Sequence, residues 1–159
     1  RALPRVVGIL AAAAAGAAGD PGPGELGALP ARHTVWSDWL AEHPGGSVVM
    51  LPAASGRGVA DFEPTAEAMV QALDHGHPLV NGYSGFFPDE HRALREGLAT
   101  FPDVATLARL RELGVTYAVA DSVWWTSTRD ATARRLGVEI VLAGPDGVLI
   151  DLTPSPRPD

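Results

Sequence analysis

Apolar residues in this chain recur either in short continuous runs or at helical spacing, and together these patterns predict an α/β domain over residues 34–153. The short runs have the length of strands and are bounded by Gly and Pro. They span residues 47–51, 115–120, 138–142 and 148–152. The last two flank Gly144-Pro145-Asp146-Gly147, where Pro and Asp favour a type I turn and Gly accepts a positive φ, so we expect an antiparallel hairpin.

The segments between these runs carry apolar residues three and four positions apart, as in helices with one buried face. A first helix is predicted around Trp36, Trp39 and Leu40. A second is predicted after a loop at residues 53–62, because Pro64 suits a first helical turn. Its inward face is expected to consist of Ala66, Met69, Val70 and Leu73.

Three further helices are predicted from residues that can accept a hydrogen bond at a helix start. Asp89 and Asp103 each begin one, and Gly114 ends the second of them. Ser127-x-x-Asp130 resembles a capping box for a helix that Gly137 closes. The expected inward residues of the first two are Leu94 and Leu98, then Leu107 and Leu110.

The order of these elements predicts a small mixed sheet of about four strands with helices packed on it. The strand, helix and strand between residues 115 and 142 favour a right-handed parallel unit, and the hairpin adds an antiparallel strand. The domain is preceded by two other segments. Residues 1–19 are interpreted as the end of a transmembrane helix or as a signal segment, because two Arg precede an apolar Ala-rich run that is too short for a full span. Residues 20–33 form a Pro/Gly linker, and residues 154–159 a tail expected to be disordered.

Composition excludes several classes of function. The net charge is −7 and the chain has Arg but no Lys, with the Arg scattered, so a nucleic-acid partner is not expected. The absence of cysteine excludes disulfides, thiol catalysis and Cys-based zinc sites. No phosphate-binding Gly loop is present, and Tyr83-Ser84-Gly85 lacks the first Gly of a nucleophile elbow.

One block is more specific than any of these patterns. Val80-Asn81-Gly82-Tyr83-Ser84-Gly85-Phe86-Phe87-Pro88 resembles the C-terminal region of bacterial multi-pass membrane proteins of the GT-C glycosyltransferase superfamily, those related to protein mannosyltransferases. Three further blocks fit the same order: Val48-Val49-Met50-Leu51-Pro52, Phe101-Pro102, and Leu107-x-x-Leu110-Arg111-x-Leu113-Gly114-Val115-x-Tyr117-Ala118-Val119.

The resemblance implies an extracytoplasmic domain at the cell membrane, attached to an enzyme that moves sugar from a polyprenyl-phosphate carrier. In that family the catalytic carboxylate lies in an early loop between membrane helices, so no catalytic residue is assigned here. The implied partners are the membrane part of the same polypeptide and the polyprenyl-phosphate sugar or the acceptor. No cofactor is implied.

Two groups of residues are candidates for ligand binding. Asn81, Tyr83 and Ser84 offer an aromatic face with hydrogen-bond donors and acceptors, although the same loop could serve turns and backbone pairing alone. Trp124 and Trp125 follow the strand at 115–120, and ligands of α/β sheets bind at the carboxyl ends of strands. The alternative is that one Trp covers the sheet and the other is partly exposed.

Two other clusters are weighed for chemistry. Asp74-His75-Gly76-His77 lacks a third metal ligand and suits a helix C-terminus, so no metal site is predicted. Paired carboxylates for acid–base catalysis could come from Asp61 and Glu63 with Asp89 and Glu90, but caps and solvated loop charges are the simpler interpretation.

The sequence thus supports a non-catalytic accessory domain of a membrane-bound glycosyltransferase that uses a polyprenyl-phosphate-linked sugar. The alternative is a free-standing secreted domain that binds a small ligand or a carbohydrate. A hydrolase that uses the acidic loop residues is the third and weakest hypothesis.

Overall fold

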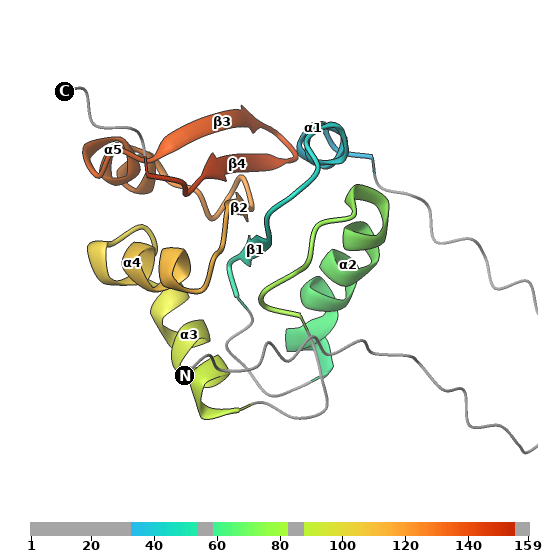
Figure 1. The fold of residues 1–159 in the computed structure, drawn as a ribbon, viewed down its shortest axis with the longest axis horizontal. Coiled ribbons are helices and arrows are strands. Elements are labelled where there is room, and N and C mark those ends of the chain that lie inside the picture. Colours follow the sequence, from blue (N-terminus) through green and yellow to red (C-terminus); the bar gives the residue numbers. More distant parts are fainter. Residues whose placement is uncertain (1–32, 54–58, 83–87, 155–159) are drawn as a thin grey trace, which may run out of the picture. The chain divides into compact units, whose positions relative to one another are not determined.

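A computed structural model describes residues 33–53, 59–82 and 88–154, all of which belong to the compact unit Ala31–Asp159 (Figure 1). The predicted segment 1–19, the linker up to residue 32, and residues 155–159 of the predicted tail lie outside the described residues.

The sheet has four strands in the order β1-β2-β4-β3, which confirms the predicted mixed α/β fold. Their bounds are β1 Val48–Leu51, β2 Tyr117–Ala120, β3 Glu139–Gly144 and β4 Gly147–Asp151. β1 is parallel to β2, and β4 is antiparallel to both β2 and β3. β2 and β3 therefore run in the same direction, as the strand–helix–strand pattern predicts.

The two strands of that unit are nevertheless not neighbours, because β4 lies between them. Burial explains the arrangement. Residues Gly147–Ile150 of β4 are all buried, whereas β3 begins with an exposed Glu139 and has no fully buried residue. The more apolar strand of the hairpin occupies the interior position, and the more polar strand lies at the edge.

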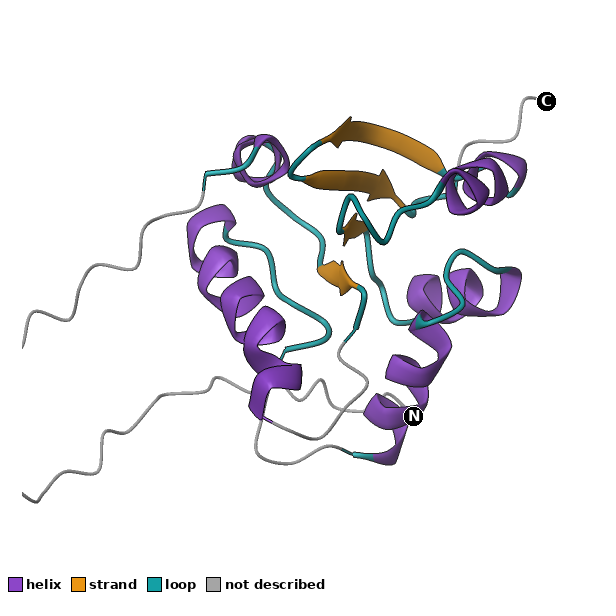
Figure 2. Ribbon diagram, turned by 180° about the vertical axis from the view of Figure 1, so that it is seen from behind, coloured by secondary structure: helices purple, strands orange, loops and turns teal. Residues whose placement is uncertain are grey.

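Each face of the sheet has its own helical layer (Figure 2). Alternate residues of β2 and β4 point to opposite faces, as the period of a strand requires. Ala118, Ala120 and Ile150 pack against α3 (Asp89–Leu98), α4 (Val104–Glu112) and α5 (Ser127–Arg135). On the other face Val119 and Leu149 pack against α1 (Val35–Glu42).

The N-cap residues of the helices agree with the prediction in one case and differ from it in two. Asp103 caps α4 as predicted, since its carboxylate accepts a hydrogen bond from the Thr106 backbone N–H at 3.0 Å. The cap of α5 is Thr126, not Ser127, and its hydroxyl accepts from the Arg129 N–H. The N-cap of α3 is Pro88, so Asp89 lies in the first turn instead. Its negative charge interacts favourably there with the positive end of the helix dipole.

Helix α2 (Val59–His75) differs most from the prediction. It begins at Val59, before Pro64, so residues 59–62 of the expected loop at 53–62 are helical. Its predicted apolar face is wrong as well. Ala66 and Leu73 are exposed, Leu73 to 83%, and Met69 and Val70 are only partly covered, whereas Ala68 and His75 are buried. The apolar spacing misidentified the buried side, because this helix turns small and polar residues inward.

No helix in residues 33–53, 59–82 and 88–154 combines the length and the apolar character that a membrane span needs.

Candidate functional site

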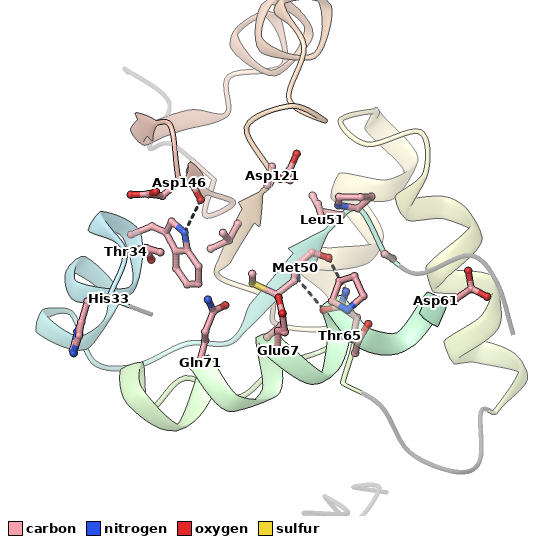
Figure 3. Close-up of a pocket in the computed structure, with 18 residues that line it drawn as sticks. His33, Thr34, Met50, Leu51, Asp61, Thr65, Glu67, Gln71, Asp121 and Asp146 are labelled. Carbon is pink, nitrogen blue, oxygen red and sulfur yellow. Dashed lines mark hydrogen bonds between the residues drawn. The ribbon is translucent and has the colours of Figure 1, made fainter. Parts of the chain in front are cut away.

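A cleft of about 990 Å³ opens at the carboxyl ends of the parallel strands β1 and β2, between the sheet and α2 (Figure 3). Leu51 is the register partner of Ala120, so Pro52 and Ala53 emerge from the sheet beside Asp121. Ligands of open α/β sheets bind at this edge, and the volume lies at the upper end of the range for small-molecule sites. We therefore take this cleft as the candidate functional site.

The inward face of α2 explains why the space is open. Thr65, Ala68 and Gln71 lie three residues apart on the side of the helix that lines the cleft. Figure 3 shows Thr65 and Gln71 on the side of α2 nearest Met50 of β1. Because these side chains are short or polar, they do not fill the distance to the sheet with apolar volume, as Leu or Met would.

The wall opposite α2 is held in place by directional contacts. The indole Nε1–H of Trp36 donates to the Asp146 carbonyl at 3.1 Å, which ties α1 to the β3–β4 turn. The Ser122 hydroxyl donates to the Pro145 carbonyl at 2.8 Å, which ties the same turn to the segment after β2. Gly147 is required beneath Trp36, because a Cβ there would lie 2.8 Å from the Ala120 carbonyl oxygen and its φ is +137°. The wall is thus preorganised.

Asn81, one of the predicted ligand-binding residues, lines this cleft but is also engaged with the backbone. Its Oδ1 accepts from the Met50 N–H at 2.9 Å, and its Nδ2 donates to the Met50 carbonyl at 2.6 Å. The side-chain amide therefore completes the outer edge of β1, as the backbone of a further strand would. Tyr83 and Ser84, predicted with it, lie outside the described residues.

Four acidic residues are among those that line the cleft, two from each wall. Asp61 and Glu67 come from α2, and Asp121 and Asp146 come from the sheet side. Asp121 is oriented by its own turn, since its Oδ1 accepts from the N–H groups of Val123 and Trp124 at 2.8 and 2.9 Å. His33 is the fifth ionisable residue of the lining, and its Nδ1 lies 3.2 Å from the Asp38 carboxylate.

The predicted aromatic pair lies after β2 as expected but does not line the cleft. Trp125 is 9% exposed and packs in the core, 6.2 Å from Phe101 between ring centroids. Trp124 is partly buried, and the Arg129 guanidinium lies 3.9 Å from its ring centroid. This arrangement matches the alternative in which one Trp covers the core and the other is partly exposed. A ligand role for the pair stays a prediction.

His75 and His77 form a buried pair that joins α2 to α1 and the sheet. The His77 Nε2 lies 2.9 Å from the Leu40 carbonyl, and the His77 backbone N–H donates to the His75 Nδ1 at 3.1 Å. His75 also makes an edge contact with Trp36, at 6.1 Å between centroids. Burial lowers the pKa of His75, and His77 lowers it further against the opposing effect of Asp74. The pair therefore acts as a structural link, and the part of the chain that the structure describes holds no group of three or more potential metal ligands.

The carboxylates considered for catalysis do not converge. Asp61 lines the cleft, but Glu63 is exposed on α2 and Asp89 and Glu90 are exposed at the start of α3. Asp89 pairs with Arg92 on its own helix. These four residues therefore do not form an acid–base pair in the cleft.

Several cleft residues were missed from the sequence: Trp36, Thr65, Gln71 and Asp146. A signal existed in Thr65, Ala68 and Gln71, whose spacing places a small and polar stripe on one side of a helix. Comparisons of this chain with protein-family models, with curated proteins and with solved structures find no match.

Proposed function

We propose that this chain is a non-catalytic, ligand-binding accessory domain of a membrane-bound glycosyltransferase that uses a polyprenyl-phosphate-linked sugar. The observation that supports binding is the cleft at the carboxyl ends of β1 and β2, with an apolar floor and polar groups on two walls. In this proposal the domain lies on the extracytoplasmic side of the cell membrane and its partner is the membrane part of the same polypeptide.

The make-up of the cleft supports a binding role over a catalytic one. Its floor includes strand residues such as Met50 and Val119, and its rim holds Thr65, Gln71 and separated acidic residues. Covalent catalysis needs a nucleophile within hydrogen-bond reach of a base. Among the described residues that line the cleft, the one histidine is His33, and its ring nitrogen is directed to Asp38.

The attachment to a membrane enzyme is supported by the resemblance of Val80–Pro88 and by the apolar run that precedes the linker. Reading the natural gene upstream of Arg1 tests it. We expect eight or more apolar segments of about 20 residues each, the length of a transmembrane helix. A start codon within a few residues of Arg1 would contradict the accessory-domain proposal.

That second outcome would favour the alternative, a free-standing secreted domain that binds a small ligand or a carbohydrate. The same cleft supports it, because its rim and floor do not depend on a membrane part. Mass spectrometry of the mature N-terminus distinguishes a cleaved signal segment from a retained membrane helix.

A further inference from the structure

Two polar side chains on the cleft wall formed by α2 are not used by the fold. Thr65 and Gln71 both line the cleft, and Figure 3 shows them on the side of α2 nearest Met50. Both are partly buried, and neither side chain has a hydrogen-bond partner among the described residues. Polar groups that lose contact with water are normally paired in a folded protein. A hydroxyl and a primary amide are therefore available to a ligand in the cleft.

The spacing of the two side chains favours an elongated ligand. Gln71 follows Thr65 by six positions in α2, which corresponds to about 9 Å along the helix axis. Ala68 lies midway between them on the same side, and its side chain adds no more than a methyl group to the wall. A ligand with polar groups along one side can therefore contact both Thr65 and Gln71 while it passes over Ala68.

The strand residues that face α2 across the cleft are apolar. Met50 of β1 and Val119 of β2 are register partners, and both belong to the hydrophobic cluster on this side of the sheet. Asn81 also lines the cleft, but its amide is already paired with the N–H and the carbonyl of Met50. A ligand between α2 and these strands thus meets hydrogen-bonding groups on one side and apolar side chains on the other. A sugar ring has this character, with hydroxyls at its edge and C–H groups on its face.

An apolar chain would be a poor occupant of the same space. It would cover the Thr65 hydroxyl and the Gln71 amide without giving them partners, at a cost of roughly five- to 150-fold in affinity for each group. A ligand with hydroxyl or amide groups avoids this cost. The Thr65 hydroxyl and the Gln71 amide can each donate and accept, so such groups can bind to them in either sense.

We propose that the cleft binds an elongated, hydroxylated ligand such as an oligosaccharide, and that Thr65 and Gln71 are its specificity-determining residues. This inference rests on the proposed function and deepens it, because it names the ligand class and the side chains that recognise it. Met50 and Val119 supply apolar contact, and the hydrogen bonds to α2 distinguish a hydroxylated ligand from an apolar chain.

The test is calorimetric titration of the full 159-residue chain with a neutral trisaccharide of N-acetylglucosamine and, separately, with 1-octanol. Thr65→Val and Gln71→Met keep similar volumes and remove the hydrogen-bonding groups. Each should weaken trisaccharide binding by roughly two- to tenfold, the value of one hydrogen bond, and should not weaken octanol binding. Because neither side chain makes a hydrogen bond to the described residues, the urea midpoints of both variants should stay at the wild-type value.

Thr128→Val is the matched control. Thr128 is exposed on α5, outside the described lining of the cleft, so this variant should bind the trisaccharide as wild type does. Unchanged trisaccharide affinity in either cleft variant, or tighter binding of octanol than of the trisaccharide, would overturn this inference alone. Binding of neither probe would overturn the binding role itself and this inference with it.

Discussion

The two faces of the sheet are packed by different chemistry. On the face covered by α3, α4 and α5, the core consists mainly of aliphatic side chains such as Leu98, Leu107 and Leu110. On the face covered by α1, aromatic and imidazole rings join the aliphatic residues. Trp36 contacts His75, and both Trp39 and His77 contact Tyr117. We call these the aliphatic face and the ring face.

The difference shows that one face supplies most of the core and the other shapes the candidate site. Aliphatic packing is non-directional and tolerates exchange among side chains of similar volume. The ring face depends on directional contacts, because Trp36 donates to the Asp146 carbonyl and the His77 ring contacts the Leu40 carbonyl. These contacts also fix α1 and the β3–β4 turn at the rim of the cleft. The ring face therefore positions the candidate site, and the aliphatic face supplies most of the core.

The largest effect is expected from a cavity on the aliphatic face. Leu110 is fully buried, so Leu110→Ala should lower the free energy of unfolding by about 2–5 kcal/mol. Urea denaturation measures this. Val104→Ala on the same helix is the control, because Val104 is 70% exposed and its truncation should cost less than about 0.5 kcal/mol. Equal costs for the two variants would contradict the assignment of this face as the main core.

A smaller effect is expected on the ring face from Trp36→Phe. This variant loses the hydrogen bond to the Asp146 carbonyl and part of the buried ring, which together should cost about 1–3 kcal/mol. Amide chemical shifts in the β3–β4 turn should change as well. Trp39→Phe is the matched control, since Trp39 is only partly buried and its contacts are ring stacking with His43 and Tyr117. A larger loss of unfolding free energy in Trp39→Phe than in Trp36→Phe would contradict the claim that the ring face depends on directional contacts.

The smallest of the stability effects concerns pH. The folded pKa of His75 is lowered, chiefly by burial, so the unfolded chain binds more protons below its usual pKa of about 6.5. The stability due to neutral His75 is therefore fully present above that pH and decreases as the pH falls toward the folded pKa. Urea midpoints measured between pH 7.5 and 5.5 test this dependence.

His75→Gln should flatten that pH profile. His91→Gln should do so less, because His91 is only partly buried, although burial and Arg95 lower its pKa too. If His91→Gln flattened the profile more than His75→Gln, the ring face would not be the acid-sensitive part of the molecule.

The sequence predicted the sheet well, since short apolar runs bounded by Gly and Pro have few alternatives in a chain of this composition. It also predicted the Asp103 cap and the Gly114 stop, which depend on local hydrogen bonds and a φ of +75°. It did not predict the inward face of α2, because Met69, Val70 and Leu73 satisfy helical spacing and only tertiary packing decides which side is buried. That face forms one wall of the cleft, so the same error kept Thr65 and Gln71 from being predicted as site residues.

Asn81 shows a related limit. A loop Asn was predicted to bind ligand or backbone, and its pairing with Met50 depends on a contact 31 residues away along the chain. Such distant partners cannot be inferred from local pattern. For the same reason Asp146 and Trp36 could not be assigned to one site, although each was visible as a turn or a core residue.

The most direct test of the central claim is to map, by amide NMR, where a neutral trisaccharide of N-acetylglucosamine perturbs the full chain. The account predicts shifts in Met50–Ala53 after β1, in Thr65–Gln71 of α2 and at Asp121, with little change in α4 and α5. Shifts that cluster around Trp124 and α5, or no shifts at saturating trisaccharide, would contradict the assignment of the cleft as the binding site.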